Sequence, residues 1–461
     1  MSKLPNTLEL GNILKMALPL AFGQLGGIII GITDTLMLGR MGPDALGAVG
    51  LALAVYGIIL TVGMGMGMGM GMIFPVIVLA SQARGAGRLR TVPGIIRQGL
   101  WIAGILSVPA CIILWNLEEI LLRTGQVPDL VQMAGQYMDY MLWTVFPALG
   151  LFVFMFALTT MGRVGTVAVT MWLGAGINVI LDYALIFGNF GFPAMGIAGA
   201  GLASVIVYTS GFLFLFTLLA FHRTFRSGTR FRRAWRPKWP VIEQFFRLGW
   251  PKSLEILMIS GLFSVFSLLV GRIGVEAIAA HTIAFQISMV VGLGSEGIAN
   301  AVAIRIGIAS GGKDYAGDNL WRVLNSGLLL LFLFMLPPMV VLNLFPLWAV
   351  GLFVGSDSET QNLLPVASSV VVVAAFFIFI HGFCLVANRA SNGLADMKIP
   401  ALITVAAYWG IALPAGIVLG FFMDLGVLGI WWGLLIGGAA AAVSYPMRFG
   451  WVVRHASFKP G

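Results

Sequence analysis

The residues best suited to chemistry in this sequence are three polar side chains inside long apolar stretches. Asp34 stands alone in the run Ile30–Leu36, and Asn178 and Asp182 lie four residues apart in a second apolar stretch. On a helix that spacing places the amide and the carboxyl group on one face. Together they offer hard oxygen ligands to a small cation, or a hydrogen-bonded carboxyl group that exchanges a proton. Hydrogen bonding between helices, without a functional role, is the structural alternative.

The second half of the chain contains further polar candidates, for which the sequence gives less support. Glu255 follows Lys252 by three residues, so a neutral ion pair is as reasonable an interpretation as a polar site. His381 lies in an apolar stretch, and an unperturbed imidazole titrates near neutral pH. We therefore treat Glu255 and His381 as a candidate second polar site. Glu296 and Asn300, again one helical turn apart, are candidates for lining a substrate cavity.

An unbroken alternation of glycine and methionine runs from Gly63 to Met72. In a helix Met64, Met68 and Met72 would share one face, and the glycines would permit close helix approach. Thioethers suit copper, but no Cys or His accompanies them. A pliable apolar wall of a substrate cavity and plain packing are the other two interpretations.

The composition shows what kind of element must position these residues. Of the 461 residues 59% are hydrophobic and only 10% are charged, against about 25% charged in soluble domains. This excludes a soluble enzyme, a secreted disulfide scaffold and a nucleic-acid-binding protein. Cys111 and Cys384 lie in apolar runs, where we expect them to be buried and unpaired. Gly307–Lys313 matches a phosphate-binding loop only in part, so no enzyme and no cofactor is expected.

Apolar stretches of membrane-spanning length, roughly 20 residues or more, occur twelve times. No alternating-strand pattern of a β-barrel accompanies them. The sequence thus predicts an all-α polytopic membrane protein. The expected helices cover about 13–38, 45–80, 97–116, 131–160, 167–189, 194–221, 245–271, 277–308, 322–348, 364–388, 398–421 and 426–453.

The basic residues predict the orientation of the chain. They concentrate in the connections that share a side with the N-terminus, above all in a cluster at 223–238. The positive-inside rule then places both termini in the cytoplasm. Orientation and contact with anionic lipid explain this cluster without a protein or nucleic-acid partner.

The chain also repeats itself. A shift of 232 residues superimposes Pro19 on Pro251, and Gly42 on Gly274. The shift predicts two six-helix lobes related by a pseudo-twofold axis along the membrane normal. We expect an N-lobe at 1–222, a basic linker at 223–243 and a C-lobe at 244–461. A cavity between such lobes, opening alternately to each side, is typical of a secondary transporter.

Several of these motifs resemble one family, the MATE (multidrug and toxic compound extrusion) transporters of the NorM type. The resemblance covers essentially the whole chain. The matching segments are Thr33–Thr35 with Gly39–Gly42, Asn178–Gly188 with Gly196–Ala200, Ala279–His281, Ile304–Gly307 and Gly393–Asp396.

The resemblance implies cation-driven export of organic, often cationic, drugs through a V-shaped pair of lobes. The family's N-lobe cation site maps onto Asp34, Asn178 and Asp182. The C-lobe departs from the NorM pattern, since the expected glutamate falls at Ile259, one turn after Glu255. The expected helix-ten aspartate falls at His381, and imidazole is a poor ligand for sodium.

We therefore expect a proton-driven multidrug antiporter, in which Asp34 carries the proton and H+ is the coupling ion. A sodium-driven antiporter, with Asp34, Asn178 and Asp182 as metal ligands, is the close alternative. A lipid or polysaccharide-precursor flippase is a third, although such a protein needs a basic cavity and these spans hold acids. The expected setting is a monomer in a bacterial inner membrane, with small organic cations as substrates.

Overall fold

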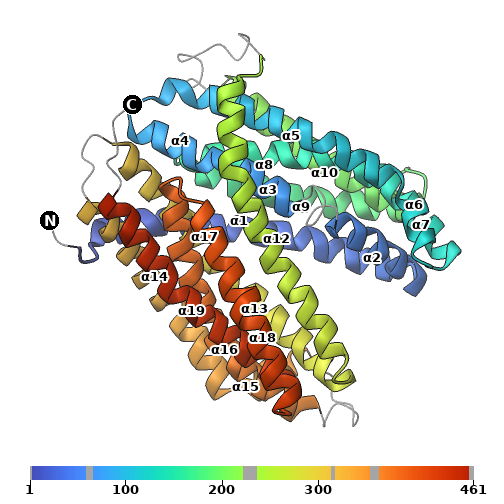
Figure 1. Cartoon of the computed structure of the whole chain (residues 1–461). Coiled ribbons are helices and arrows are strands. Elements are labelled where there is room, and N and C mark those ends of the chain that lie inside the picture. The colour runs from blue at the N-terminus through green and yellow to red at the C-terminus, as the bar shows by residue number, and fades with distance from the viewer. Residues whose placement is uncertain (1–2, 59–65, 222–235, 313–316, 354–362, 456–461) are drawn as a thin grey trace. The chain divides into compact units, whose positions relative to one another are not determined.

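The computed structural model describes residues 3–58, 66–221, 236–312, 317–353 and 363–455, and these form helices without any β-strand (Figure 1). Eleven helical segments in this part of the chain are long and apolar enough to cross a membrane. The protein is thus a multi-pass membrane protein, as its composition predicts.

Helices of the first half follow the predicted spans closely, apart from the span at 131–160, which contains a short 3-10 segment at Leu142–Thr144, and the span at 45–80. The span expected at 45–80 is interrupted, and Pro75 begins a new helix because its ring cannot donate a backbone hydrogen bond. Of the methionines, Met72 is buried, Met68 has only its backbone described, and Met64 lies outside the described residues. The elements are α1 (Thr7–Gly39), α2 (Pro43–Ile58), α3 (Met66–Ile73), α4 (Pro75–Gly85), η2 (Leu89–Thr91), α5 (Val92–Trp115), α6 (Leu117–Arg123), α7 (Pro128–Met141), η3 (Leu142–Thr144), α8 (Val145–Thr160), α9 (Val164–Phe187) and α10 (Ile197–Phe221).

Helices of the second half are longer and less interrupted. Two π-helical segments, η5 and η6, occur in the eleventh predicted span, on either side of a short α-helix. The elements are α12 (Trp239–Gly271), α13 (Val275–Gly311), α14 (Gly317–Leu344), α15 (Pro346–Gly351), α16 (Leu363–Gly393), α17 (Lys398–Thr404), η5 (Val405–Ala412), α18 (Leu413–Ile417), η6 (Val418–Phe422) and α19 (Gly426–His455).

The duplication is visible in the element bounds. Helices α1 and α12 each have 33 residues, and both their first and their last residues are 232 positions apart. Pro19 and Pro251 occupy the same place in the two helices. Gly42 and Gly274, which precede α2 and α13, both have positive φ, at 123° and 150°. A side chain is strained in that region, so glycine suits both turns.

The chain forms two compact units that do not coincide with its two halves. One unit is Phe22–Ser253; the other combines Met1–Ala21 with Leu254–Gly461. The two boundaries, after Ala21 and after Ser253, are again 232 positions apart. Helices α1 and α12 therefore each contribute their first part to one unit and the remainder to the other.

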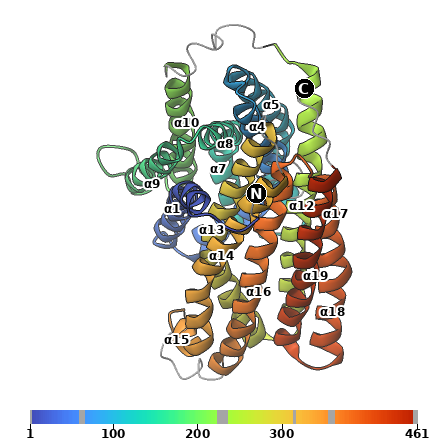
Figure 2. The ribbon, with the colours of Figure 1, turned by 90° about the vertical axis from the view of Figure 1, so that its left-hand side faces the viewer.

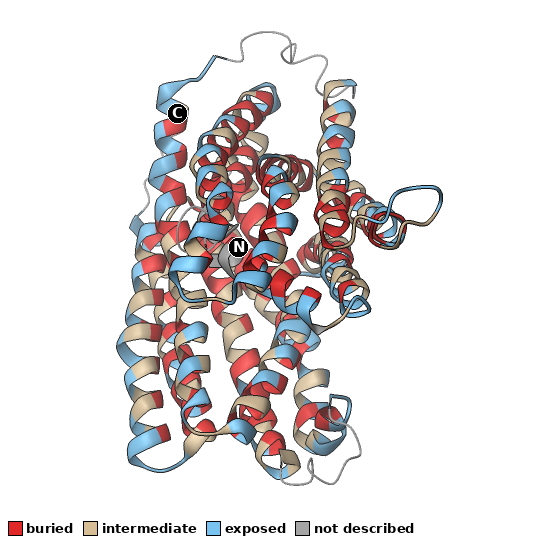
Figure 3. Cartoon of the chain, turned by 90° about the vertical axis from the view of Figure 1, so that its right-hand side faces the viewer, coloured by how far each residue is buried: buried red, intermediate tan, exposed pale blue. Residues whose placement is uncertain are grey.

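In the unit that contains Leu254–Gly461, α13, α16 and α19 pack along one another (Figure 2). Buried residues form stripes on the helix faces that meet (Figure 3). Packing of α19 is close because Gly429, Gly433 and Gly437 recur every four residues and face α17–η6. A Cβ atom at Gly429 would lie 2.5 Å from the Gly420 nitrogen, and one at Gly437 2.6 Å from the Ala407 oxygen. In lipid the hydrophobic effect does not drive helices together, so their association depends on van der Waals packing. Small residues at such crossings allow the helix backbones to pack closely.

Candidate cation site

Asp34, Asn178 and Asp182 lie together in the unit Phe22–Ser253. Asp34 is near the C-terminal end of α1 and is half-buried. Asn178 and Asp182 lie on one face of α9, and both have 0% exposure. The same-face arrangement on α9 was predictable from the spacing, whereas the approach of α1 to this face comes from the tertiary structure.

The amide of Asn178 joins the two helices. Its Nδ2 atom donates a hydrogen bond to Asp34 Oδ1 at 3.1 Å. The carboxyl groups of Asp34 and Asp182 are also within interaction distance of each other. Two acidic groups and one amide thus form a single cluster, in which the charge on one carboxyl group affects the other.

Three buried oxygen atoms of this cluster have no hydrogen-bond donor among the described residues. They are Asn178 Oδ1 and both carboxyl oxygens of Asp182. Buried polar atoms are nearly always satisfied, because an unsatisfied one costs about 1–3 kcal/mol. The cluster therefore has acceptor atoms available for a proton, a small cation or water.

The surroundings of the cluster are apolar and aromatic. Ile30, Ala175 and Val207 form a small buried group between α1, α9 and α10. Tyr137 and Tyr208 lie within electrostatic range of Asp34. Apolar surroundings of this kind strengthen every charge interaction inside them, so a change of charge at Asp34 has a large energetic effect.

Glu255 and His381 both lie near one phenol in the other unit. His381 Nδ1 is 3.2 Å from the hydroxyl of Tyr408, and Glu255 is within electrostatic range of that same tyrosine. Lys252, which is 1% exposed, lies over the ring of Phe74 at 5.5 Å from its centroid. The structure thus brings both residues of the predicted pair near one tyrosine.

Glu296 and Asn300, predicted as cavity-lining candidates one helical turn apart, contact each other on α13. The Asn300 amide nitrogen is 3.5 Å from Glu296 Oε2. Arg389 on α16 also approaches that oxygen, at 3.4 Å. Sequence reasoning missed Arg389, because 93 residues separate it from Glu296.

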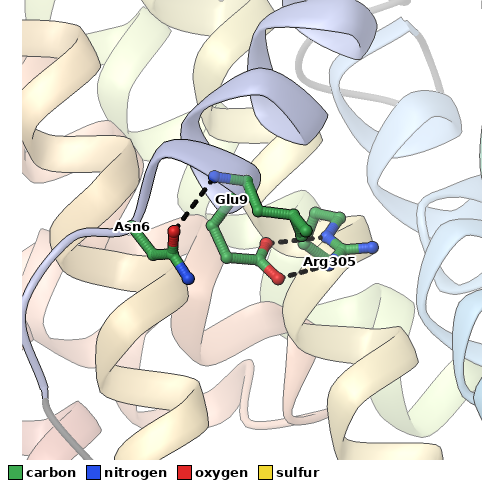
Figure 4. Close-up of polar contacts among 4 residues, drawn as sticks. Asn6, Glu9 and Arg305 are labelled. Carbon is green, nitrogen blue, oxygen red and sulfur yellow. Dashed lines mark hydrogen bonds and ion pairs between the residues drawn. The ribbon is translucent and has the colours of Figure 1, made fainter.

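A second ion pair that sequence reasoning missed connects the start of α1 to α13 (Figure 4). Arg305 donates from Nε to Glu9 Oε2 at 3.1 Å and from its terminal nitrogen to Glu9 Oε1 at 2.6 Å. Asn6 accepts a hydrogen bond from the Leu8 backbone nitrogen at 3.1 Å, which caps the first turn of α1. A lone Glu near a chain end carries no sequence signal for such a partner.

Comparison with known proteins identifies the family of this chain. The family named MatE matches the chain twice, at residues 19–184 and at residues 251–418. The chain belongs to the MatE family. The two matches begin 232 positions apart, at Pro19 and Pro251, which agrees with the repeat found in the sequence. MATE proteins are transporters, so the prediction that this chain is not an enzyme is confirmed.

Bacterial relatives match nearly the full length of the chain. One from Mesorhizobium japonicum, named "Probable multidrug resistance protein NorM", is 32% identical over 94% of this chain and 92% of its own. A protein of the same name from Synechocystis is 30% identical over 96% and 94%. The predicted resemblance to NorM-type MATE transporters is confirmed.

Solved structures share the fold at lower identity. The MATE transporter VcmN of Vibrio cholerae, in its bent form, superimposes with a TM-score of 0.86 at 19% identity, over 97% of this chain and 98% of that one. A MOP superfamily transporter from Pyrococcus furiosus gives 0.85 at 21% identity, over 97% of both chains. The all-α fold of MATE transporters, with twelve helices in two lobes, is thereby confirmed.

Proposed function

We propose that this MATE protein is a proton-coupled multidrug antiporter that exports organic cations from a bacterial cytoplasm across the inner membrane. The names of its full-length relatives support multidrug export. The observation that supports the coupling site is the buried cluster of Asp34, Asn178 and Asp182 with its three unsatisfied oxygen atoms.

In this proposal a change of charge in the cluster drives the cycle. With Asp34 ionised, the Asn178 amide donates to its carboxylate and the cluster attracts a cationic substrate. A proton that arrives from outside neutralises Asp34 and removes this attraction, so the substrate leaves. Asp34 is the proton carrier, while Asn178 and Asp182 adjust its proton affinity through the hydrogen bond and through like charge.

Sodium coupling is the second candidate, and the same three oxygen atoms favour it. Carboxylate and amide oxygens are the ligands that hard cations prefer. In this version Asp34, Asn178 and Asp182 bind sodium directly, and sodium entry replaces proton entry.

Ethidium transport into proteoliposomes, under an imposed pH gradient or an imposed sodium gradient, separates the two. Transport driven by pH alone, and abolished by Asp34→Asn, is the expected result. Asp44→Asn, at an exposed position in the first turn of α2, is the control and should transport normally. Transport driven by sodium alone would replace protons by sodium as the coupling ion. If neither gradient drives ethidium transport, or if Asp34→Asn transports as well as the wild type, the proposal is overturned.

A further inference from the structure

A cavity of about 490 Å³ lies inside the second unit, between α12, α13 and α16. Its volume is that of a typical small-molecule site. The lining combines three aromatic rings, five serines, one carboxylate and one imidazole. The cluster around Asp34 contributes nothing to it, because that cluster lies in the other unit.

The aromatic part of the lining consists of Phe263, Phe285 and Phe377. The ring centroid of Phe263 is 5.1 Å from that of Phe285 and 6.1 Å from that of Phe377. The imidazole of His381 stacks on Phe377 at 5.4 Å. Ring faces carry partial negative charge and attract organic cations, most strongly where water is excluded.

The serines add acceptor oxygens to this wall. Ser264, Ser267 and Ser288 donate their hydroxyl protons to backbone carbonyls four residues earlier. Each oxygen keeps lone pairs that can accept or can face a positive charge. Ser295, which is 2% exposed, has a buried hydroxyl oxygen with no partner among the described residues. An unsatisfied buried polar atom in a cavity wall indicates that the cavity takes a polar or charged ligand.

Glu296 supplies the negative charge. Its contacts with Arg389 and Asn300 both use Oε2, and among the described residues Oε1 takes part in no hydrogen bond or ion pair. The side chain of Glu296 is 36% exposed, against 11% for Arg389, and the ion pair between them is long at 3.4 Å. The carboxylate therefore has an exposed portion for a ligand while the guanidinium lies more deeply buried.

The residues that give this cavity its character are not repeated at the matching positions of the first half. With the 232-residue shift, Glu296 corresponds to Met64 and Phe263 to Gly31; conversely, Asp34 corresponds to Phe266. The two halves have thus diverged, with the acidic cluster retained in one and the aromatic carboxylate cavity formed in the other.

We propose that this cavity, with Glu296 as its anionic anchor and Phe263, Phe285 and Phe377 as its walls, is a binding subsite for aromatic organic cations. The inference rests on the proposed export of organic cations and names a second place where such a substrate is held. A substrate is then held at two places, near the coupling cluster of Asp34 in one unit and in this subsite of the other unit.

A thiol-protection assay tests this subsite without any transport. Ser264→Cys places a thiol in the exposed part of the lining, in a background carrying Cys111→Ala and Cys384→Ala. Thr282→Cys on α13, exposed and outside the lining, is the matched control. We expect tetraphenylphosphonium to slow N-ethylmaleimide labelling of Ser264→Cys but not of Thr282→Cys. Tetraphenylborate, which has the same shape and the opposite charge, should protect neither.

Substitution of Glu296 tests whether the protection depends on its negative charge. Glu296→Gln should raise the concentration of tetraphenylphosphonium needed for protection about tenfold, whereas Glu276→Gln, at an exposed position on the same helix, should not. If Glu296→Gln fails to fold because the ion pair with Arg389 is lost, Phe285→Leu tests the aromatic wall instead and should also weaken protection.

Protection by tetraphenylborate equal to that by tetraphenylphosphonium, or labelling that neither ion slows, would overturn the subsite. Asp34→Asn should keep full protection even when ethidium transport is lost. A failure of the proposed coupling is thereby distinguished from a failure of this inference.

Discussion

Asn178 is the residue on which the geometry of the cation site depends most directly. It is fully buried, and its amide nitrogen makes the recorded contact between α9 and Asp34. Asn178→Leu keeps a side chain branched at Cγ but removes both the donor and the oxygen, so we expect gradient-driven ethidium transport to fall at least about tenfold, the effect of losing roughly 1.4 kcal/mol. Asn189→Leu, at a half-buried position just after α9, is the control. Unchanged transport in Asn178→Leu would remove this residue from the site.

The ion pair between Glu9 and Arg305 makes a prediction about stability. Glu9 is 8% exposed, so Arg305→Leu leaves a buried carboxylate without its bidentate partner. We expect a loss of about 1–3 kcal/mol and a lower melting temperature in detergent. Arg123→Leu is the matched control: its partner Glu119 is also 2.6 Å away, but the two side chains are 78% and 62% exposed. Exposed pairs contribute less than about 1 kcal/mol, so equal melting shifts for the two variants would contradict the argument.

For individual residues, the sequence predicts which polar side chains matter but not most of the residues that they contact. The spacing of Asn178 and Asp182 predicts their common face, and that of Glu296 and Asn300 places them one helical turn apart. The partners Arg389 and Arg305 come from distant helices, and spacing along one helix contains no information about them. The aromatic cavity was missed for the same reason, because its rings come from three helices and each phenylalanine alone is typical of a membrane span.

At the scale of elements, α19 packs so closely on the segment from α17 to η6 that there is little room for side chains between them. Gly433 lies against Gly416, and a Cβ atom there would also come within 2.8 Å of the Ala412 oxygen. Gly433→Ala should therefore force the helices apart and cost about 1–3 kcal/mol, as overpacking of a tight core does. Gly410→Ala in η5 meets nothing within 4 Å, and its melting temperature should stay at or above that of the wild type. A Gly433→Ala protein as stable as Gly410→Ala would show that the crossing tolerates a methyl group.

Element boundaries were predictable from sequence wherever an apolar stretch was uniform. The span expected at 167–189 is α9 at 164–187, and the span expected at 426–453 is α19 at 426–455. The exception was the stretch at 45–80, where hydropathy is continuous but Pro75 starts a separate helix. Hydropathy measures how apolar a segment is, whereas helix continuity depends on backbone hydrogen bonds that proline cannot make.

For the whole molecule, the distribution of basic residues predicts that both termini face the cytoplasm. A green fluorescent protein fused after residue 461 should fluoresce, whereas alkaline phosphatase at that place should be inactive. The same two reporters fused after Asn189, in the connection between α9 and α10, should give the opposite pattern. An active phosphatase at the C-terminus would reverse the predicted orientation.

The sharing of α1 between the two units has a consequence for biosynthesis. Glu9 is made 296 residues before its partner Arg305, which at 5–20 residues per second corresponds to about 15–60 s. During that interval Ile13 and Ala17 lack the helices of the core in which they are finally buried. The earliest part of the chain must therefore remain without these partners until α13 has been synthesised and inserted.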